Sequence, residues 1–207
     1  GLWPESPADK SRASFDTLLS RARRVLDAAC HPLSAKNYLE LKRGVLALIN
    51  CHAEDEDFSA EIVSGLRLAR QGRPWQAGNR LYRGLRLWRG GYLSQVEVED
   101  EQLRARRSEL ERLYLQGVLV WGGLLVAAGR DDDALNLYNE ALRVDPTQHD
   151  LVKALYELHS RGRSPVAARR VLEQYRKALA RADYEMDEID AIVESLWTAP
   201  AENSQNF

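Results

Sequence analysis

The sequence predicts a mostly α-helical fold in which a series of helical hairpins follows one N-terminal helix and a β-hairpin. Two observations predict it. Apolar residues recur at three- and four-residue spacing through most of the chain. Glycine and proline are sparse, 13 and 7 of 207 residues, and they cluster between the periodic stretches. The hydrophobic share of 44% is ample for a packed core, so the chain is globular rather than disordered.

The first predicted helix covers residues 10–28. Apolar residues such as Phe15, Leu19 and Leu26 recur there at the spacing of one helical stripe, which we expect to be buried. The other face is polar and basic, and it carries Ser14, Thr17, Ser20, Arg21 and Arg24.

A change of pattern between residues 37 and 49 predicts a β-hairpin. The stretches Tyr38–Leu41 and Val45–Leu48 suit two short strands, and Lys42, Arg43 and Gly44 between them form a basic turn. The acidic run Glu54–Asp57 follows. Carboxylates favour a helix N-terminus, so we expect Asp57 or a neighbour to cap the next helix.

The rest of the chain predicts helices at residues 57–71, 74–87, 98–128, 131–143, 148–161, 164–181 and 185–197. Each break between them contains residues that end or begin helices. These are Gly72 and Pro74, Gly90 and Gly91, Gly129 with Asp131–Asp133, Asp145 and Pro146, and Gly162 with Ser164 and Pro165. Residues 198–207 are polar, and we expect them to be disordered.

The hairpins repeat. Ala134 and Ala168 stand 34 positions apart, which is the length of a tetratricopeptide repeat (TPR). The small, small, aromatic, small and proline positions of that repeat are occupied by Gly122, Ala134, Tyr138, Ala141 and Pro146. An earlier unit repeats the pattern with Gly65, Ala77, Leu81 and Gly84, and a later one with Leu155, Ala168, Leu172 and Tyr175. Small residues allow two helices to approach closely. The expected fold is a TPR-like helical-hairpin repeat module, with an ordinary helical bundle as the alternative.

Several stretches carry a family resemblance. They are Ala77–Tyr92 with the run Leu87–Leu93, the long helix with Arg104, Arg107, Leu110 and Tyr114, and the segments Gly129–Pro146 and Gly162–Tyr175. Over these stretches the chain resembles the bacterial transcriptional activator domain, which occurs in antibiotic-pathway regulators and related large transcription factors. In that family a winged helix of the response-regulator type precedes the activator domain.

The resemblance implies a domain division. Residues 1–54 are similar to the recognition helix and wing of a partial winged-helix DNA-binding domain, with Arg43 and Gly44 at the wing turn. Residues 55–197 would form the activator domain, and residues 198–207 a tail. The first strands and first helix of a winged helix are missing, and we expect a truncated chain to be the reason.

The implied function is that of a transcription regulator, an activator, which binds promoter DNA. We expect the helix to contact the major groove or its phosphates, and the hairpin to reach backbone or minor groove. The candidate residues are Ser14, Thr17, Ser20, Arg21, Arg24, Lys42 and Arg43. A solvated helix face would show the same pattern. The alternative function is a TPR-like protein-interaction scaffold that does not bind DNA.

The helical module would serve oligomerisation, including a homodimer, signal response, or contact with RNA polymerase. Repeat arrays present a groove, and its candidate lining residues are Arg80, Tyr82, Arg83, Arg86 and Tyr114. The aromatic residues of the module are expected to form repeat core rather than a ligand cage. They are Trp75, Trp88, Tyr92, Tyr114, Trp121 and Tyr138.

Other classes are not expected. The net charge is only -2, so any nucleic-acid surface is local, and the first 50 residues hold eight basic against five acidic residues. No catalytic motif predicts an enzyme or a cofactor. The pairs Cys30-His31 and Cys51-His52 have poor spacing for zinc. Neither a leader nor a membrane span is apparent, and two cysteines suit a reducing cytoplasm.

Overall fold

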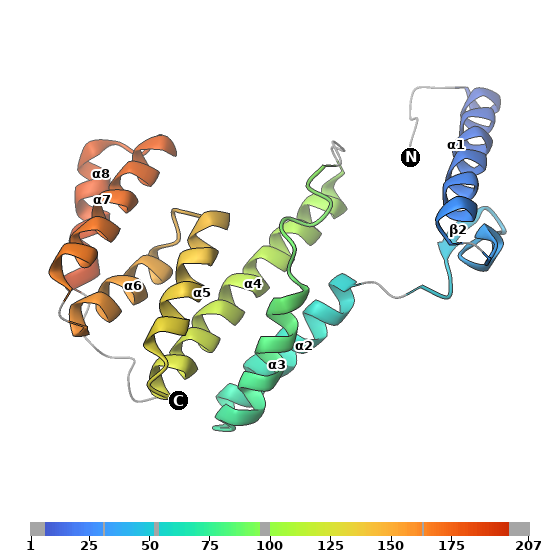
Figure 1. Ribbon diagram of the computed structural model, residues 1–207. Helices are drawn as coiled ribbons and strands as arrows, with labels where there is room; N and C mark the ends of the chain where they lie inside the picture. Colours follow the sequence, from blue (N-terminus) through green and yellow to red (C-terminus); the bar gives the residue numbers. More distant parts are fainter. Residues whose placement is uncertain (1–6, 31, 52–53, 96–99, 163, 199–207) are drawn as a thin grey trace. The chain divides into compact units, whose positions relative to one another are not determined.

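The structure, a computed structural model, describes residues 7–30, 32–51, 54–95, 100–162 and 164–198 (Figure 1). It divides into two compact units, which are treated separately below. We call Gly1–Ala53 the N-terminal unit and Glu54–Phe207 the helical unit. Of the tail predicted to be disordered, Thr198 ends a helix and residues 199–207 lie outside the described residues.

The N-terminal unit contains the predicted helix and β-hairpin. Helix α1 spans Ala8–Ala29, a short 3-10 helix η1 spans Ala35–Asn37, and strands β1 (Leu39–Lys42) and β2 (Val45–Leu48) pair antiparallel. Because Lys42 lies opposite Val45, the turn consists of Arg43 and Gly44 alone, with φ of 51° and 81°. Positive φ at both positions matches the twist of a two-residue hairpin turn, and glycine adopts it without strain.

A carboxylate joins the helix to the hairpin side of this unit. One oxygen of Asp27 accepts hydrogen bonds from the backbone N–H of Ala35 at 2.6 Å and from the Ser34 hydroxyl at 3.4 Å. The apolar core is small, since Leu19 and Ala35 are the only buried hydrophobic residues among the described part of this unit. Other apolar side chains are exposed: Leu18, Val25, Leu33, Leu41, Val45, Leu46 and Leu48. Part of the apolar stripe that was expected to be buried is therefore uncovered.

The helical unit is a succession of seven helices within the described residues. They are α2 (Glu54–Arg70), α3 (Pro74–Leu87), α4 (Glu101–Ala127), α5 (Asp131–Val144), α6 (His149–Arg161), α7 (Pro165–Arg181) and α8 (Met186–Thr198). The predicted mostly helical, TPR-like fold is confirmed. The cap at Asp57 is wrong: α2 begins at Glu54, so Asp57 lies inside the first turn. At that position the negative charge of Asp57 interacts favourably with the helix dipole, but the side chain does not cap the helix.

Small residues bring the repeat helices together as the pattern predicted. A Cβ atom on Gly122 of α4 would lie 2.3 Å from the Tyr138 ring of α5. Likewise, a Cβ on Gly65 of α2 would lie 2.6 Å from the side chain of Leu81 on α3. Neither position has room for a larger residue, so glycine sets the distance between the two helices of each hairpin.

Helix α4 is central to the first part of the array, because α2, α3 and α5 all pack against it. Among the described residues it is the one helix long and apolar enough, by length and composition alone, to cross a membrane. Its mean hydropathy over the relevant window is 1.2, and 39% of that window is buried inside the protein. Buried apolar residues such as Leu113, Val118 and Leu125 give α4 the character of a core helix.

Candidate functional site

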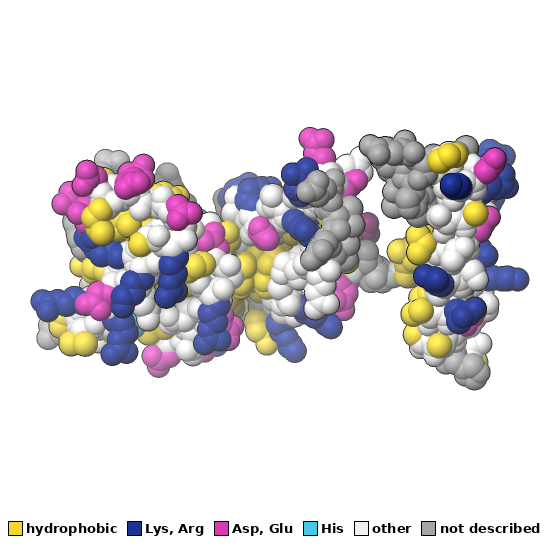
Figure 2. Space-filling view, turned by 90° about the horizontal axis from the view of Figure 1, so that it is seen from above, with side chains coloured by type: hydrophobic (Ala, Val, Ile, Leu, Met, Phe, Trp, Pro, Cys, Tyr) yellow, Lys and Arg dark blue, Asp and Glu magenta, His cyan; other side chains and the backbone are white. Residues whose placement is uncertain are grey.

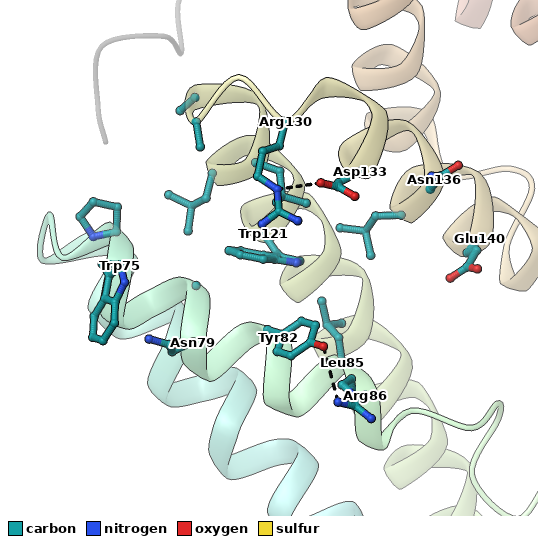
Figure 3. Close-up of a pocket in the computed structure, with 17 residues that line it drawn as sticks. Trp75, Asn79, Tyr82, Leu85, Arg86, Trp121, Arg130, Asp133, Asn136 and Glu140 are labelled. Carbon is teal, nitrogen blue, oxygen red and sulfur yellow. Dashed lines mark hydrogen bonds and ion pairs between the residues drawn. The ribbon is translucent and has the colours of Figure 1, made fainter.

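A groove lies between α3 and α5 of the helical unit, with α4 as its floor. Its volume is about 970 Å³, which is at the upper end of the range for ligand sites. Figure 3 shows Trp121 of α4 between residues of α3 on one side and residues of α5 on the other. We call this hollow the α3–α5 groove.

Four side chains from α3 form the first wall. Pro74 at the first helical turn starts α3, since its fixed φ suits that position. Trp75, Asn79, Tyr82 and Arg86 then follow at spacings of four, three and four residues, which places them along one stripe. All four line the groove, and all are exposed. The wall thus alternates aromatic rings with polar groups.

The floor is apolar and fixed in place. Trp121 lies against Gly78, where a Cβ atom would approach the indole to 2.4 Å. The Tyr82 ring lies near it, with ring centroids 6.5 Å apart and planes tilted by 55°. Leu85 and Leu124 add apolar surface beside the indole. The close approach of Gly78 to the indole limits the movement of Trp121, which lines the groove.

Helix α5 supplies a polar second wall. Asp133, Asn136 and Glu140 recur at three- and four-residue spacing and all line the groove. Arg130, just before the helix, donates a hydrogen bond to Asp133 at 2.7 Å, so these two charges neutralise each other.

Two opposite charges in the groove are not neutralised by ion pairs. The guanidinium of Arg86 lies over the Tyr82 ring, 5.7 Å from its centroid, and its contact with the Tyr82 hydroxyl is long at 3.5 Å. Within the described part of the chain, neither Arg86 nor Glu140 forms an ion pair. The groove therefore offers one cation and one anion, with no net charge.

The structure brings together only two of the five residues expected to line a partner groove. Tyr82 and Arg86 line the α3–α5 groove, whereas Arg83 is exposed on α3 outside it. Arg80 donates a hydrogen bond to Glu61 of α2 at 2.8 Å. Tyr114 is buried in the core, 7% exposed, so it does not reach the groove.

Tyr114 belongs to an aromatic cluster in the core. Its ring stacks on Trp88 with centroids 4.4 Å apart, and Phe58 lies 5.4 Å from Trp88. Burial, helped by the negative charge of Glu140, raises the pKa of Tyr114. Here the expected role as repeat core is confirmed, as it is for Tyr138, whose pKa burial raises to about 12.

The same expectation is wrong for Trp75, which is 80% exposed. Trp75 is the second residue of α3, and no helix covers it there (Figure 3). Trp121 packs against the core and also lines the groove, so it serves in both. The signal that could have revealed the exposed position of Trp75 is the alternation of aromatic and polar side chains on one stripe of α3.

Two neighbouring arginines of α4 form contacts with other parts of the helical unit. Arg106 of α4 donates two hydrogen bonds to Asp55 of α2, at 2.8 and 3.1 Å, and its side chain is 29% exposed. Arg107 donates to the backbone carbonyls of Tyr92 and Leu93 in the loop after α3. The sequence predicted neither contact. Together they join α4 to α2 and to the loop that follows α3.

The residues predicted to contact DNA lie on the surface of the N-terminal unit. Ser14, Thr17, Ser20, Arg21, Arg24, Lys42 and Arg43 are all exposed. The Thr17 hydroxyl bonds back to the carbonyl of Ala13 at 2.8 Å, and Lys42 lies 3.7 Å from Glu40. Figure 2 shows basic and hydrophobic side chains together on this unit. Contact of these residues with DNA stays a prediction.

The structure describes only the cysteines of the two Cys-His pairs. Cys30 and Cys51 are free, and their neighbours His31 and His52 lie outside the described part. Where side chains are described, no group of three or more His, Cys, Asp or Glu residues could hold an ion.

Comparison with known proteins identifies the helical unit. The profile of the bacterial transcriptional activator domain family matches residues 54–191, about two thirds of the chain. This confirms the resemblance found in the sequence. No curated protein sequence matches the chain.

Two solved structures are similar to the chain. One is Mycobacterium tuberculosis EmbR in complex with a low-affinity phosphopeptide, with a TM-score of 0.63 and 20% identity. The match covers 94% of this chain and 52% of EmbR, so the chain spans about half of that protein's length. The other is the C-terminal TPR-containing domain of a Plasmodium falciparum FK506-binding protein, with a TM-score of 0.45 and 12% identity. That match covers 69% of this chain and 87% of the domain.

Proposed function

Since the chain belongs to the bacterial transcriptional activator domain family, a family of transcription regulators, we propose that it acts on promoter DNA in the cytoplasm as an activator. The N-terminal unit, Gly1–Ala53, is the DNA-binding part, related to the recognition helix and wing of a winged helix. The helical unit is the partner-binding part. It contacts RNA polymerase, a second copy of the chain or a signalling partner.

The observation that carries the DNA-binding proposal is the division of α1 into two faces. Phe15, Leu19 and Leu26 are buried or half-buried toward the rest of the unit, while Arg21 and Arg24 lie on the exposed face. An α-helix fits the major groove of B-form DNA, and an arginine fork can grip guanine edges or phosphates. The Arg43-Gly44 turn adds a second basic point in the same unit.

The exposed apolar residues of the N-terminal unit favour a second candidate, a protein-interaction scaffold without DNA binding. Leu18 and Val25 on α1 and Leu48 on β2 are each about half exposed or more. Apolar surface of this kind is typical of contacts between proteins. The two candidates predict different responses to salt.

The test is DNA binding at two salt concentrations, with labelled duplexes selected from a random-sequence pool. The 207-residue chain and any longer product of its gene are both measured at about 50 and 200 mM salt. The proposal expects affinity to fall steeply with salt, because phosphate contacts release counterions. The double variant Arg21→Ala/Arg24→Ala should lower the slope of log K against log salt by about 2.

A matched control removes two exposed arginines from the helical unit, Arg169→Ala/Arg170→Ala on α7. Its slope should equal that of the unaltered protein. If the slope of the control falls as much as the slope of the α1 variant, the total charge of the protein rather than α1 governs DNA binding. If neither protein binds at the lower salt, the interaction scaffold replaces the DNA-binding proposal.

A further inference from the structure

The α3–α5 groove has the length of a short extended peptide. The α3 stripe from Trp75 to Arg86 covers eleven residue steps, which is about 16 Å along a helix. An extended chain rises about 3.3 Å per residue, so roughly five residues would fit along this wall. The second wall runs beside it from Asp133 to Glu140. A groove with two long walls suits an elongated ligand better than a compact one.

Amide side chains stand on both walls. Asn79 of α3 and Asn136 of α5 are exposed and line the groove. Neither forms a hydrogen bond with another residue that the structure describes. Each carries a donor and an acceptor, which is the complement of a peptide group with its C=O and N–H. Hydrogen bonds between an amide side chain and a peptide group do not depend on the side chains of the ligand.

The floor offers one apolar surface between these amides. Trp121 is held against Gly78 and presents its ring next to Tyr82 and Leu124. A ring that is already fixed loses little conformational entropy when a ligand packs on it. The floor therefore suits one bulky aliphatic or aromatic side chain.

The charges of the groove argue against a polyanion. Arg130 is paired with Asp133, and the remaining cation and anion, Arg86 and Glu140, stand on opposite walls. DNA or RNA would need an excess of positive charge along the groove. A peptide of low net charge meets no such requirement. The exposed indole of Trp75, at one end of the stripe, adds apolar surface of the kind found at interfaces.

We propose that the α3–α5 groove binds an extended peptide segment of a partner protein. Asn79 and Asn136 pair with the peptide backbone, and one bulky apolar side chain packs on Trp121. This proposal rests on the proposed role of the helical unit as the partner-binding part, and it identifies the class of partner.

The test starts from selection of a displayed library of short random peptides on the full chain. We expect the selected peptides to share one bulky apolar position. Their affinity should fall at least tenfold for Trp121→Ala, as for a central aromatic hot spot. Asn136→Ala should also weaken binding severalfold. The matched control is Asn139→Ala on the same helix, whose amide donates to the carbonyl of Leu135 outside the groove lining, and it should bind normally.

A spectroscopic readout locates the peptide. The chain has five tryptophans, and incorporation of fluorotryptophan gives each a separate fluorine resonance. Titration with a selected peptide should shift the resonances of Trp75 and Trp121, assigned with Trp75→Phe and Trp121→Phe, and leave that of the core residue Trp88 in place. Circular dichroism checks that each variant is folded, and exposed Asn136 provides a test even if Trp121→Ala does not fold.

Three results would overturn the proposal. One is a selection that yields no common peptide, and another is equal weakening by Asn136→Ala and Asn139→Ala. The third is a shift of the Trp121 resonance with small aromatic compounds alone, at affinities above those of any peptide. The DNA-binding result is independent, because Arg21 and Arg24 lie in the other unit. Loss of one activity with retention of the other therefore shows which proposal failed.

Discussion

Gly122 and Gly123 are neighbours on α4, yet alanine should have opposite effects at the two positions. A Cβ on Gly122 would lie 2.3 to 2.4 Å from two ring carbons and the hydroxyl oxygen of Tyr138, a residue that is 4% exposed and cannot move freely. A Cβ on Gly123 would meet nothing within 4 Å. The pair thus separates the steric demand of repeat packing from the general preference of helices for alanine.

The magnitudes follow from these surroundings. Alanine in place of glycine stabilises a helix interior by about 1 kcal/mol. At Gly123 nothing opposes this gain, so Gly123→Ala should raise the free energy of unfolding by about 1 kcal/mol. At Gly122 overpacking costs about 1–3 kcal/mol, and three close atoms of Tyr138 place the cost at the upper end. Gly122→Ala should therefore lower the free energy of unfolding by about 2 kcal/mol.

Urea unfolding followed by circular dichroism measures the difference. With a slope of about 2 kcal/mol per molar urea, the two midpoints should lie about 1.5 M apart, on opposite sides of the unaltered protein. A midpoint for Gly122→Ala at or above that of the unaltered protein would refute the steric argument. It would mean that α4 and α5 are not in close contact at Gly122.

Three further predictions concern charged and phenolic groups. Arg106→Met should lower the free energy of unfolding by about 2 kcal/mol, because it leaves the half-buried carboxylate of Asp55 without its two hydrogen bonds. Burial raises the pKa of Tyr138 from 10 to about 12. The free energy of unfolding should therefore fall between pH 10 and 12, where the phenol ionises only in the unfolded chain, and Tyr138→Phe should make this fall smaller by the contribution of Tyr138. Burial alone would raise the pKa of Asp145, but hydrogen bonds from Thr147 and Gln148 outweigh it and lower the pKa. Asp145→Ala should thus destabilise the protein at neutral pH and lose its effect as the pH falls through the lowered pKa.

Each of these has a control. In an Asp55→Ser background, Arg106→Met should lower the free energy of unfolding much less than in the unaltered protein. An equal decrease would show that the ion pair does not contribute to stability. Absorbance at alkaline pH reports ionised tyrosine, and ionisation of Tyr138 near pH 10 would contradict its burial. If Asp145→Ala lowers the free energy of unfolding equally at acid and neutral pH, the negative charge of Asp145 does not contribute to stability.

Local chemistry made much of the fold predictable. Pro74 and Pro165 begin helices at the predicted places, and the glycines at 72, 90 and 129 have positive φ at the breaks. Contact of Gly122 with Tyr138 followed from the spacing of the repeat. These features depend on residues close together in the sequence, or on a pattern that recurs at a fixed interval.

Long-range features were less accessible. Arg106 and Asp55 are 51 residues apart, and no local pattern pairs them. Helical periodicity places Trp75 and Tyr114 on apolar stripes alike, but it does not reveal which stripe a neighbouring helix covers. The sequence therefore makes Tyr114 a candidate for both the core and a groove, although it is buried, and it predicts Trp75 in the core, although it is exposed. The α3–α5 groove itself needs three helices in place before its walls can be recognised.

Packing in the helical unit joins mainly helices that lie near one another in the sequence. The substantial contacts join α2 to α3, α2 and α3 to α4, and then each helix to the next as far as α8. An array of this kind can open from one end while the remainder stays closed. Backbone amides of α7 and α8 should then exchange with solvent before those of α4. A destabilising substitution in α7 or α8 would increase local unfolding of these helices. The walls of the α3–α5 groove, which lie far from them in the array, would keep their structure.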